Sequence, residues 1–252
     1  MAICSVKGVD IHYIAVGDEL KRDEAIIFIH GAGGNKQRWI YQLEAIADTA
    51  YGVALDLPGH GQSEGPPCDQ VFLYREWVRE FIAAMGLSNL IVAGHSMGGA
   101  VALDFTLKYP ELVRGLILVG SAARFKVNPV RLEAYKKGEY RAEWARESFS
   151  TSSPEELVSK YAEESMSVSP TVRYMDFLSC SRFETENIKN IKVPTLIICG
   201  TEDMSTPPVL SERLSQQIDN SELVLIENAA HQVMLEQPAM VNQSLTNFLN
   251  RV

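Results

Sequence analysis

Short apolar runs alternate along the first 120 residues with longer segments whose apolar residues recur at helical spacing. A continuous apolar run is typical of a strand that is buried on both faces of a sheet. Such runs occupy residues 25–29, 51–57, 89–93 and 113–119. The helices predicted between these strands span residues 37–47, 71–85 and 97–109. This alternation predicts an α/β fold with a mostly parallel sheet and helices on both faces.

The alternation is interrupted from residue 121 to residue 189. Charged amphipathic segments, punctuated by Pro129, Pro154 and Pro170, predict several short helices there and no buried strand. Strands and a helix return at residues 195–200, 222–226 and 239–249. We therefore expect a core domain made of residues 1–120 and 190–252, with a helical cap over residues 121–189.

The segment Gly94-His95-Ser96-Met97-Gly98-Gly99 lies between a predicted strand and a predicted helix. In a sharp turn from strand to helix, the residues two positions before and two positions after the central residue come close together. Both must therefore have almost no side chain. Such a turn presents a serine hydroxyl above the sheet edge, next to the positive end of the following helix. We predict that Ser96 is a nucleophile; an ordinary glycine-rich turn is the alternative.

A serine nucleophile needs a general base, which near neutral pH is usually a histidine. Four of the five histidines precede the nucleophile or adjoin it, in a hairpin, at a strand end or in a tight turn: His12, His30, His60 and His95. His231 follows the last predicted strand, and the small neighbours Ala229 and Ala230 let its imidazole reach over the sheet. His231 is therefore the predicted base, and a surface loop histidine is the alternative.

An acidic residue must orient the imidazole and stabilise its cation. Asp203 follows the predicted strand over residues 195–200 by a short turn, which puts it at the carboxyl edge of the sheet. Asp219 precedes a strand and is expected at the opposite edge, while Glu202 is the adjacent competitor. Asp176 belongs to the cap segment and is not expected at this edge. Asp203 is the predicted acid.

The glycine-rich segment His30-Gly31-Ala32-Gly33-Gly34 follows an early buried strand. A loop of this kind can aim a backbone N–H into the site, so the N–H groups of Ala32 and Met97 are predicted to form an oxyanion hole. A phosphate-binding loop is the rival interpretation. It fails because the chain contains neither G-x-G-x-x-G nor G-x-x-x-x-G-K-[ST].

Composition excludes several classes of protein. Of the 252 residues, 46% are hydrophobic and 22% charged, which excludes a disordered or collagen-like chain. The net charge of −9 and the lack of any Lys/Arg cluster disfavour nucleic acid and anionic membranes as partners. No signal peptide and no apolar run long enough to span a bilayer is visible, so we expect a cytoplasmic protein without membrane insertion. The four scattered cysteines have no metal-ligand spacing.

These residues together resemble the α/β-hydrolase superfamily over essentially the whole chain. The chain order Ser96, Asp203, His231 is the superfamily's order, and residues 55–63 are similar to the loop after its fourth strand. The resemblance implies an eight-stranded, mostly parallel sheet with a helical lid inserted after strand six, which would be residues 121–189. A serine at position 96 argues against dehalogenase and epoxide-hydrolase relatives, and Ala32 argues against the perhydrolase branch. Ala230 departs from the glycine that relatives usually have there.

The resemblance implies a serine hydrolase of the carboxylesterase and enol-lactonase-like branch, acting on small esters through an acyl-enzyme and without a metal or cofactor. Hydrolysis of enol-lactones or of carbon–carbon bonds in vinylogous diketones is the alternative activity. A ligand receptor on a hydrolase fold, with slow turnover, is the alternative of another class. A monomer or homodimer is expected. The cap offers these candidate pocket residues: Trp144, Phe149, Tyr161, Met166, Tyr174, Met175 and Phe177.

Overall fold

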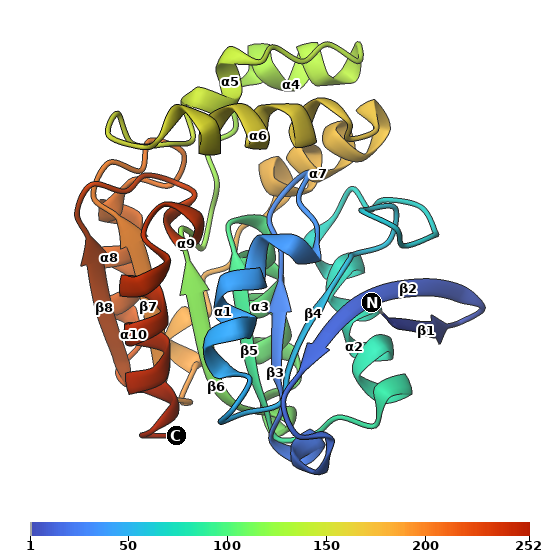
Figure 1. Cartoon of the computed structure of the whole chain (residues 1–252), viewed down its shortest axis with the longest axis vertical. Coiled ribbons are helices and arrows are strands. Elements are labelled where there is room, and N and C mark those ends of the chain that lie inside the picture. Colours follow the sequence, from blue (N-terminus) through green and yellow to red (C-terminus); the bar gives the residue numbers. More distant parts are fainter. Residues whose placement is uncertain (1) are drawn as a thin grey trace.

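The computed structural model describes residues 2–252, and one eight-stranded sheet runs through them (Figure 1). Its strand order is β1-β2-β4-β3-β5-β6-β7-β8. The strands β3 to β8 run parallel, whereas β2 pairs antiparallel with both β1 and β4. The strand bounds are β1 Ala2–Val6, β2 Val9–Val16, β3 Ile26–Ile29, β4 Gly52–Leu55, β5 Leu90–His95, β6 Val113–Val119, β7 Thr195–Gly200 and β8 Ser221–Ile226. The expected eight-stranded, mostly parallel sheet is confirmed.

Burial along the strands follows their position in the sheet. Every residue of β3, β4, β5 and β7 is buried, as the continuous apolar runs predict for inner strands. The edge strand β8 is only partly buried, with a single fully buried residue at Ile226. The carboxyl ends of the parallel strands meet at one edge of the sheet, where ligands bind in open α/β folds.

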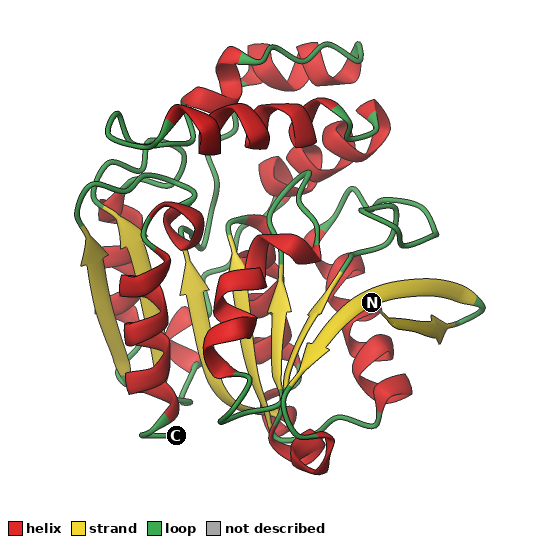
Figure 2. Cartoon of the chain, in the orientation of Figure 1, coloured by secondary structure: helices red, strands yellow, loops and turns green. Residues whose placement is uncertain are grey.

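Helices cover both faces of the sheet (Figure 2). Large apolar side chains form two layers, one containing Phe81 and Leu103 and the other Trp39 and Phe248. The helices packed on the faces or at the strand ends are α1 Ile40–Ile46, α2 Val71–Met85, α3 Met97–Lys108, α8 Pro208–Gln217, α9 Val233–Glu236 and α10 Pro238–Leu249. Short 3₁₀ turns occupy Glu19–Glu24, Lys36–Trp39, Pro110–Leu112 and Ile188–Asn190. Within residues 2–252, no helix is both long and apolar enough to cross a membrane.

The segment between β6 and β7 contains four α-helices, which lie beyond the carboxyl ends of the strands (Figure 1). Their bounds are α4 Pro129–Lys136, α5 Glu143–Arg146, α6 Glu155–Met166 and α7 Pro170–Arg182. An isolated bridge between Arg124 and Glu184 joins the two ends of this segment. We propose that residues 121–189 form a cap on a core made of residues 1–120 and 190–252.

The first helix after β3 differs from the sequence prediction. The sequence pattern predicts one helix over residues 37–47, but the chain forms the 3₁₀ turn Lys36–Trp39 and then α1. The Asn35 side chain accepts a hydrogen bond from the Gln37 N–H, which starts the turn. The buried Asp56 carboxylate accepts from both the backbone N–H and the ammonium of Lys36. These contacts fix the chain just after the glycine-rich loop.

Candidate active site

Ser96 lies at a strained turn between β5 and α3. Its φ is 53° and its ψ is −117°, a conformation that residues with a side chain rarely adopt. A Cβ at Gly94 would lie 2.1 Å from the Gly98 carbonyl oxygen, and a Cβ at Gly98 would lie 2.2 Å from the Ile29 carbonyl oxygen. Both positions therefore require glycine. The turn aims the Ser96 hydroxyl away from the sheet, as a strand-to-helix elbow does.

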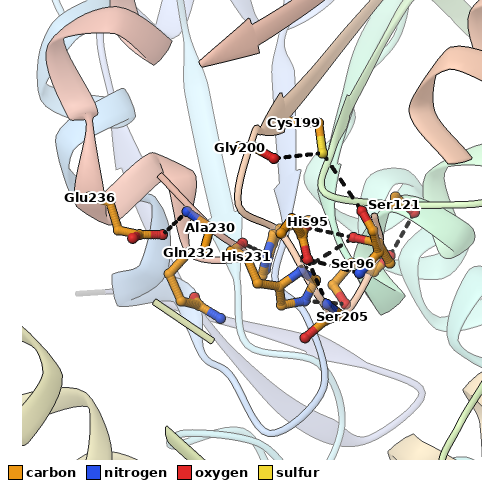
Figure 3. Close-up of polar contacts among 12 residues, drawn as sticks. His95, Ser96, Ser121, Cys199, Gly200, Ser205, Ala230, His231, Gln232 and Glu236 are labelled. Atoms are coloured by element: carbon orange, nitrogen blue, oxygen red, sulfur yellow. Dashed lines mark hydrogen bonds and ion pairs between the residues drawn. The ribbon is translucent and has the colours of Figure 1, made fainter. Parts of the chain in front are cut away.

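The structure brings Ser96, His231 and Asp203 into one hydrogen-bonded chain. Figure 3 shows Ser96 and His231 of this chain side by side. The Ser96 Oγ lies 3.0 Å from His231 Nε2, and His231 Nδ1 lies 2.9 Å from Asp203 Oδ2. A carboxylate can only accept, so the Nδ1–H of His231 donates to Asp203. In the neutral imidazole this leaves Nε2 free to accept the Ser96 O–H, which is the tautomer that a general base needs.

Asp203 is buried and held in its ionised form. Its Oδ1 accepts hydrogen bonds from the N–H groups of Ser205 and Thr206, and its Oδ2 accepts from the Thr206 hydroxyl. Burial alone raises the pKa of the carboxyl, but the facing His231 and the hydrogen bonds from Thr206 outweigh it, so the pKa lies below its ordinary value. A fixed negative charge therefore faces the imidazole.

The loop that carries His231 is held from two sides. The His95 Nε2–H donates to the His231 carbonyl over 2.8 Å, and the Glu236 carboxylate accepts from the Ala230 N–H. Burial, and then the charge of a protonated His231, lower the pKa of His95 to about 3, so His95 is neutral. His95 is buried, as its place beside Ser96 predicts, and it supports His231 through this carbonyl.

The cap also contacts this loop. The Ser148 carbonyl, between α5 and α6, accepts from the N–H groups of His231 and Gln232 at 3.1 and 3.2 Å. Two residues on, the Ser150 N–H donates to Glu236 and the Ser150 hydroxyl donates to Glu202. A short piece of the cap is thus part of the support of His231.

The predicted oxyanion donors lie on two neighbouring elements. Ala32 belongs to the loop after β3, and Met97 is the first residue of α3. Within residues 2–252, neither N–H donates to a protein acceptor. Gly31 packs against the elbow, since a Cβ there would lie 2.9 Å from His95 Nδ1 and 3.1 Å from Ser96 Cβ. This contact keeps the loop and the elbow in a fixed relation.

The two competing acids lie elsewhere. The Glu202 carboxylate accepts from the Ser150 hydroxyl at 2.8 Å, and its hydrogen bonds are to the cap. Asp219 precedes β8, where its exposed carboxylate pairs with Lys192. Both arrangements agree with the choice of Asp203 as the acid nearest His231.

Asp176, which the sequence analysis rejected as the acid because it belongs to the cap segment, is a buried residue with several hydrogen-bond partners. It lies on α7, and its side chain is fully buried. Its Oδ2 accepts from the Gly33 N–H and from His60 Nε2, each at 2.7 Å, and its Oδ1 accepts from the Tyr74 hydroxyl at 2.6 Å. The cap helix is thereby fastened to the loop that carries Ala32.

His60 and Asp176 form a buried ion pair behind the glycine-rich loop. Because the Pro58 carbonyl can only accept, the His60 Nδ1 carries a proton, and Nε2 donates its own to Asp176. Burial lowers the pKa of His60, but the Asp176 carboxylate outweighs it and raises the pKa above its ordinary value. The hydrogen bonds of the His60 ring go to Pro58 and Asp176, so His60 positions Asp176 and is no part of the Ser96–His231–Asp203 chain.

A cavity of about 320 Å³ adjoins Ser96 and His231. Its volume is at the low end for sites that bind small molecules. The cavity is bounded by the glycine-rich loop, by the turn after Asp203 and by the cap. Of the seven predicted pocket residues, three line it: Trp144, Tyr161 and Phe177. Phe149 packs against Tyr161 instead, and Met166 is exposed.

The family described as "Serine aminopeptidase, S33" matches residues 21–238, a span that contains the elbow, Asp203 and His231. The chain belongs to this family of α/β hydrolases. Its members share the fold found here, and the protein is accordingly a hydrolase of the α/β superfamily, as the resemblance predicted.

Three similar proteins have been characterised or solved. The (E)-2-((N-methylformamido)methylene)succinate hydrolase of Acinetobacter baylyi is 28% identical over 250 residues, which cover 94% of this chain and 93% of that protein. A thermophilic esterase is 34% identical with a TM-score of 0.87, over 99% of this chain and 97% of the other. The enol-lactonase of Burkholderia xenovorans has a TM-score of 0.92 at 20% identity, over 99% and 100% of the two chains, a likeness of fold alone.

We expect Asp203→Asn to lower kcat by up to about 10⁴-fold, because an amide no longer fixes the imidazole in the useful tautomer. The measurement is kcat on a soluble activated ester. Asp219→Asn, at an exposed carboxylate, is the matched control, and Glu202→Gln is measured under the same conditions. If Asp203→Asn keeps more than about a tenth of wild-type kcat while Glu202→Gln loses nearly all of it, the acid is Glu202 and not Asp203.

A second prediction concerns the fastening of the cap to the glycine-rich loop. We expect Asp176→Asn to lower kcat by about tenfold or more, because it would displace the loop that carries the predicted oxyanion donor Ala32. The full loss of such a donor lowers kcat by about 10²- to 10³-fold. Asp104→Asn, at a carboxylate of α3 that pairs with Arg75, is the control. A reduced thermal midpoint with unchanged kcat would show that Asp176 stabilises the fold only.

Proposed function

We propose that the protein is a carboxylic-ester hydrolase for small esters, with Ser96 as nucleophile, His231 as general base and Asp203 as the acid that orients the base. One observation carries the proposal. A continuous hydrogen-bonded chain runs from a buried carboxylate through an imidazole to a serine hydroxyl at a strained elbow, and it faces a cavity. This arrangement activates a hydroxyl for attack on a carbonyl carbon.

In the first half-reaction, His231 Nε2 takes the proton of Ser96 as the oxygen attacks the ester carbonyl. The bond to the alcohol then breaks, the alcohol leaves with that proton, and the acyl group stays on Ser96. In the second half-reaction, the same nitrogen deprotonates a water that attacks the acyl-enzyme. The carboxylic acid departs and the Ser96 hydroxyl is restored.

The backbone donors act on both tetrahedral intermediates. The N–H groups of Ala32 and Met97 hold the oxyanion, and the start of α3 adds the positive end of a helix. The loss of one such donor typically costs about 3–4 kcal/mol of transition-state stabilisation. A relative named as an esterase, 34% identical over nearly the whole chain, supports an ester as the target.

A fluorophosphonate is expected to form one covalent adduct per chain, on Ser96. Only a hydroxyl paired with a base reacts quickly with such a reagent. Intact-mass measurement on wild type and on Ser96→Ala tests this, with Ser167→Ala, at an exposed cap serine, as the control that labels like wild type. Labelling that persists in Ser96→Ala would remove Ser96 as the nucleophile.

We expect kcat/KM to be highest for short-chain soluble esters and to fall as the acyl chain lengthens, because the cavity holds only about 320 Å³. A panel of esters, enol-lactones, vinylogous diketones, aminoacyl anilides and emulsified triglycerides measures this. Faster cleavage of a diketone or an anilide would overturn the ester proposal. Less than one turnover per chain on every substrate would indicate a receptor.

A further inference from the structure

The cavity beside Ser96 is basic, although the chain carries a net charge of −9. One acidic side chain lines it, Glu147, against four basic ones: Arg38, Lys126, Arg131 and Arg173. Glu147 is neutralised by Arg131, with 2.5 Å between Oε2 and Nη2, and Arg38 pairs with Glu164 at 2.8 Å. Within residues 2–252, no carboxylate lies within ion-pairing distance of Arg173.

Arg173 is nevertheless buried. Its residue is only 6% exposed, on the first half of α7. The guanidinium donates through Nη2 to the Ser165 carbonyl, and its central carbon lies 3.8 Å from the centre of the Tyr140 ring. The guanidinium also lies 5.7 Å from the centre of the Tyr135 ring and close to the Tyr140 hydroxyl. It has five N–H donors, so Ser165 and Tyr140 leave some of them for another partner. A buried charge without a counter-ion is unfavourable, so an anion that enters the cavity would be a favourable partner for Arg173.

The position of Arg173 relates it to the reaction. Asp176 fastens α7 to the Gly33 N–H of the glycine-rich loop, and Arg173 lies one helical turn before Asp176. Arg173 and Ser96 line the same cavity. A small molecule with its ester carbonyl at Ser96 can therefore extend across the cavity to the guanidinium. The planar fork of an arginine, which here lies next to the Tyr140 ring, matches the two oxygens of a carboxylate.

We propose that Arg173 binds a carboxylate of the substrate, so that this site hydrolyses anionic esters such as half-esters of short dicarboxylic acids. The proposal deepens the ester-hydrolase assignment and rests on it for the turnover measurements. The competing interpretation is that Arg173 serves only to bind the Ser165 carbonyl near the end of α6.

The first experiment compares charged esters with neutral esters of the same shape. The anionic substrates are monoethyl succinate and monoethyl glutarate, and the neutral ones are ethyl 4-methylpentanoate and ethyl 5-methylhexanoate, in which an isopropyl group replaces the carboxylate. We expect wild type to favour one anionic ester by about tenfold or more in kcat/KM, the factor typical of a hydrogen bond to a charged group. A ratio near one in wild type overturns the proposal without any variant.

Variants assign the preference to Arg173. We expect Arg173→Met to reduce the anionic-to-neutral ratio by about tenfold or more, and Arg173→Lys to retain part of it because the charge remains. Arg182→Met is the matched control, at the other end of α7, where the side chain is partly exposed and pairs with Asp69. A ratio that stays the same in Arg173→Met, with both substrates slowed alike, would show that Arg173 has a structural role only.

A binding measurement separates this proposal from the ester-hydrolase assignment. Titration calorimetry of Ser96→Ala with succinate and with glutarate is expected to detect binding that is lost in Ser96→Ala/Arg173→Met. If the dicarboxylates bind through Arg173 but the protein hydrolyses no ester, the ester-hydrolase assignment is wrong and the carboxylate site at Arg173 is retained. Good hydrolysis of neutral esters, without binding of either dicarboxylate, would overturn the carboxylate site alone.

Discussion

The close approach of α3 to the backbone of β3 is the constraint on which the site depends. The helix can begin at Met97, directly after Ser96, only because Gly98 has no side chain to meet the Ile29 carbonyl and Gly94 has none to meet Gly98. The same contact sets the height of the Ser96 hydroxyl above the sheet and the direction of the Met97 N–H. The loop with Ala32 leaves β3 at this point, so both backbone donors are positioned by one packing contact.

Much of this fold is readable in the sequence because its signals are local. The strands β6 and β7 and the helix α2 have the bounds that their apolar patterns predict. The three residues of the hydrogen-bonded chain were found in the same way, from glycine spacing, from short strand-to-loop distances and from their order. Such signals can be read from the sequence without knowing which distant segments are in contact.

The sequence could not reveal Asp176 or Arg173, because their surroundings come from distant segments. Asp176 receives hydrogen bonds from His60 and Gly33, which precede it by 116 and 143 residues. In the sequence it is one more charge in a charged segment. Similarly, Tyr161 and Phe177 line the cavity while Met166 does not, since the direction in which each cap residue faces depends on how the helices pack.

The hydrogen bonds from His231 and Gln232 to the Ser148 carbonyl affect how the protein could be re-engineered. The cap invites exchange with that of a relative, because it is a single insertion between two strands. A graft that removes residues 148–150 would also remove an acceptor for the histidine loop and a partner of Glu236. Chimeras should therefore transplant this short piece together with the loop 229–236, or keep both. In this architecture, a change of cap residues 148–150 also changes the support of the loop that carries His231.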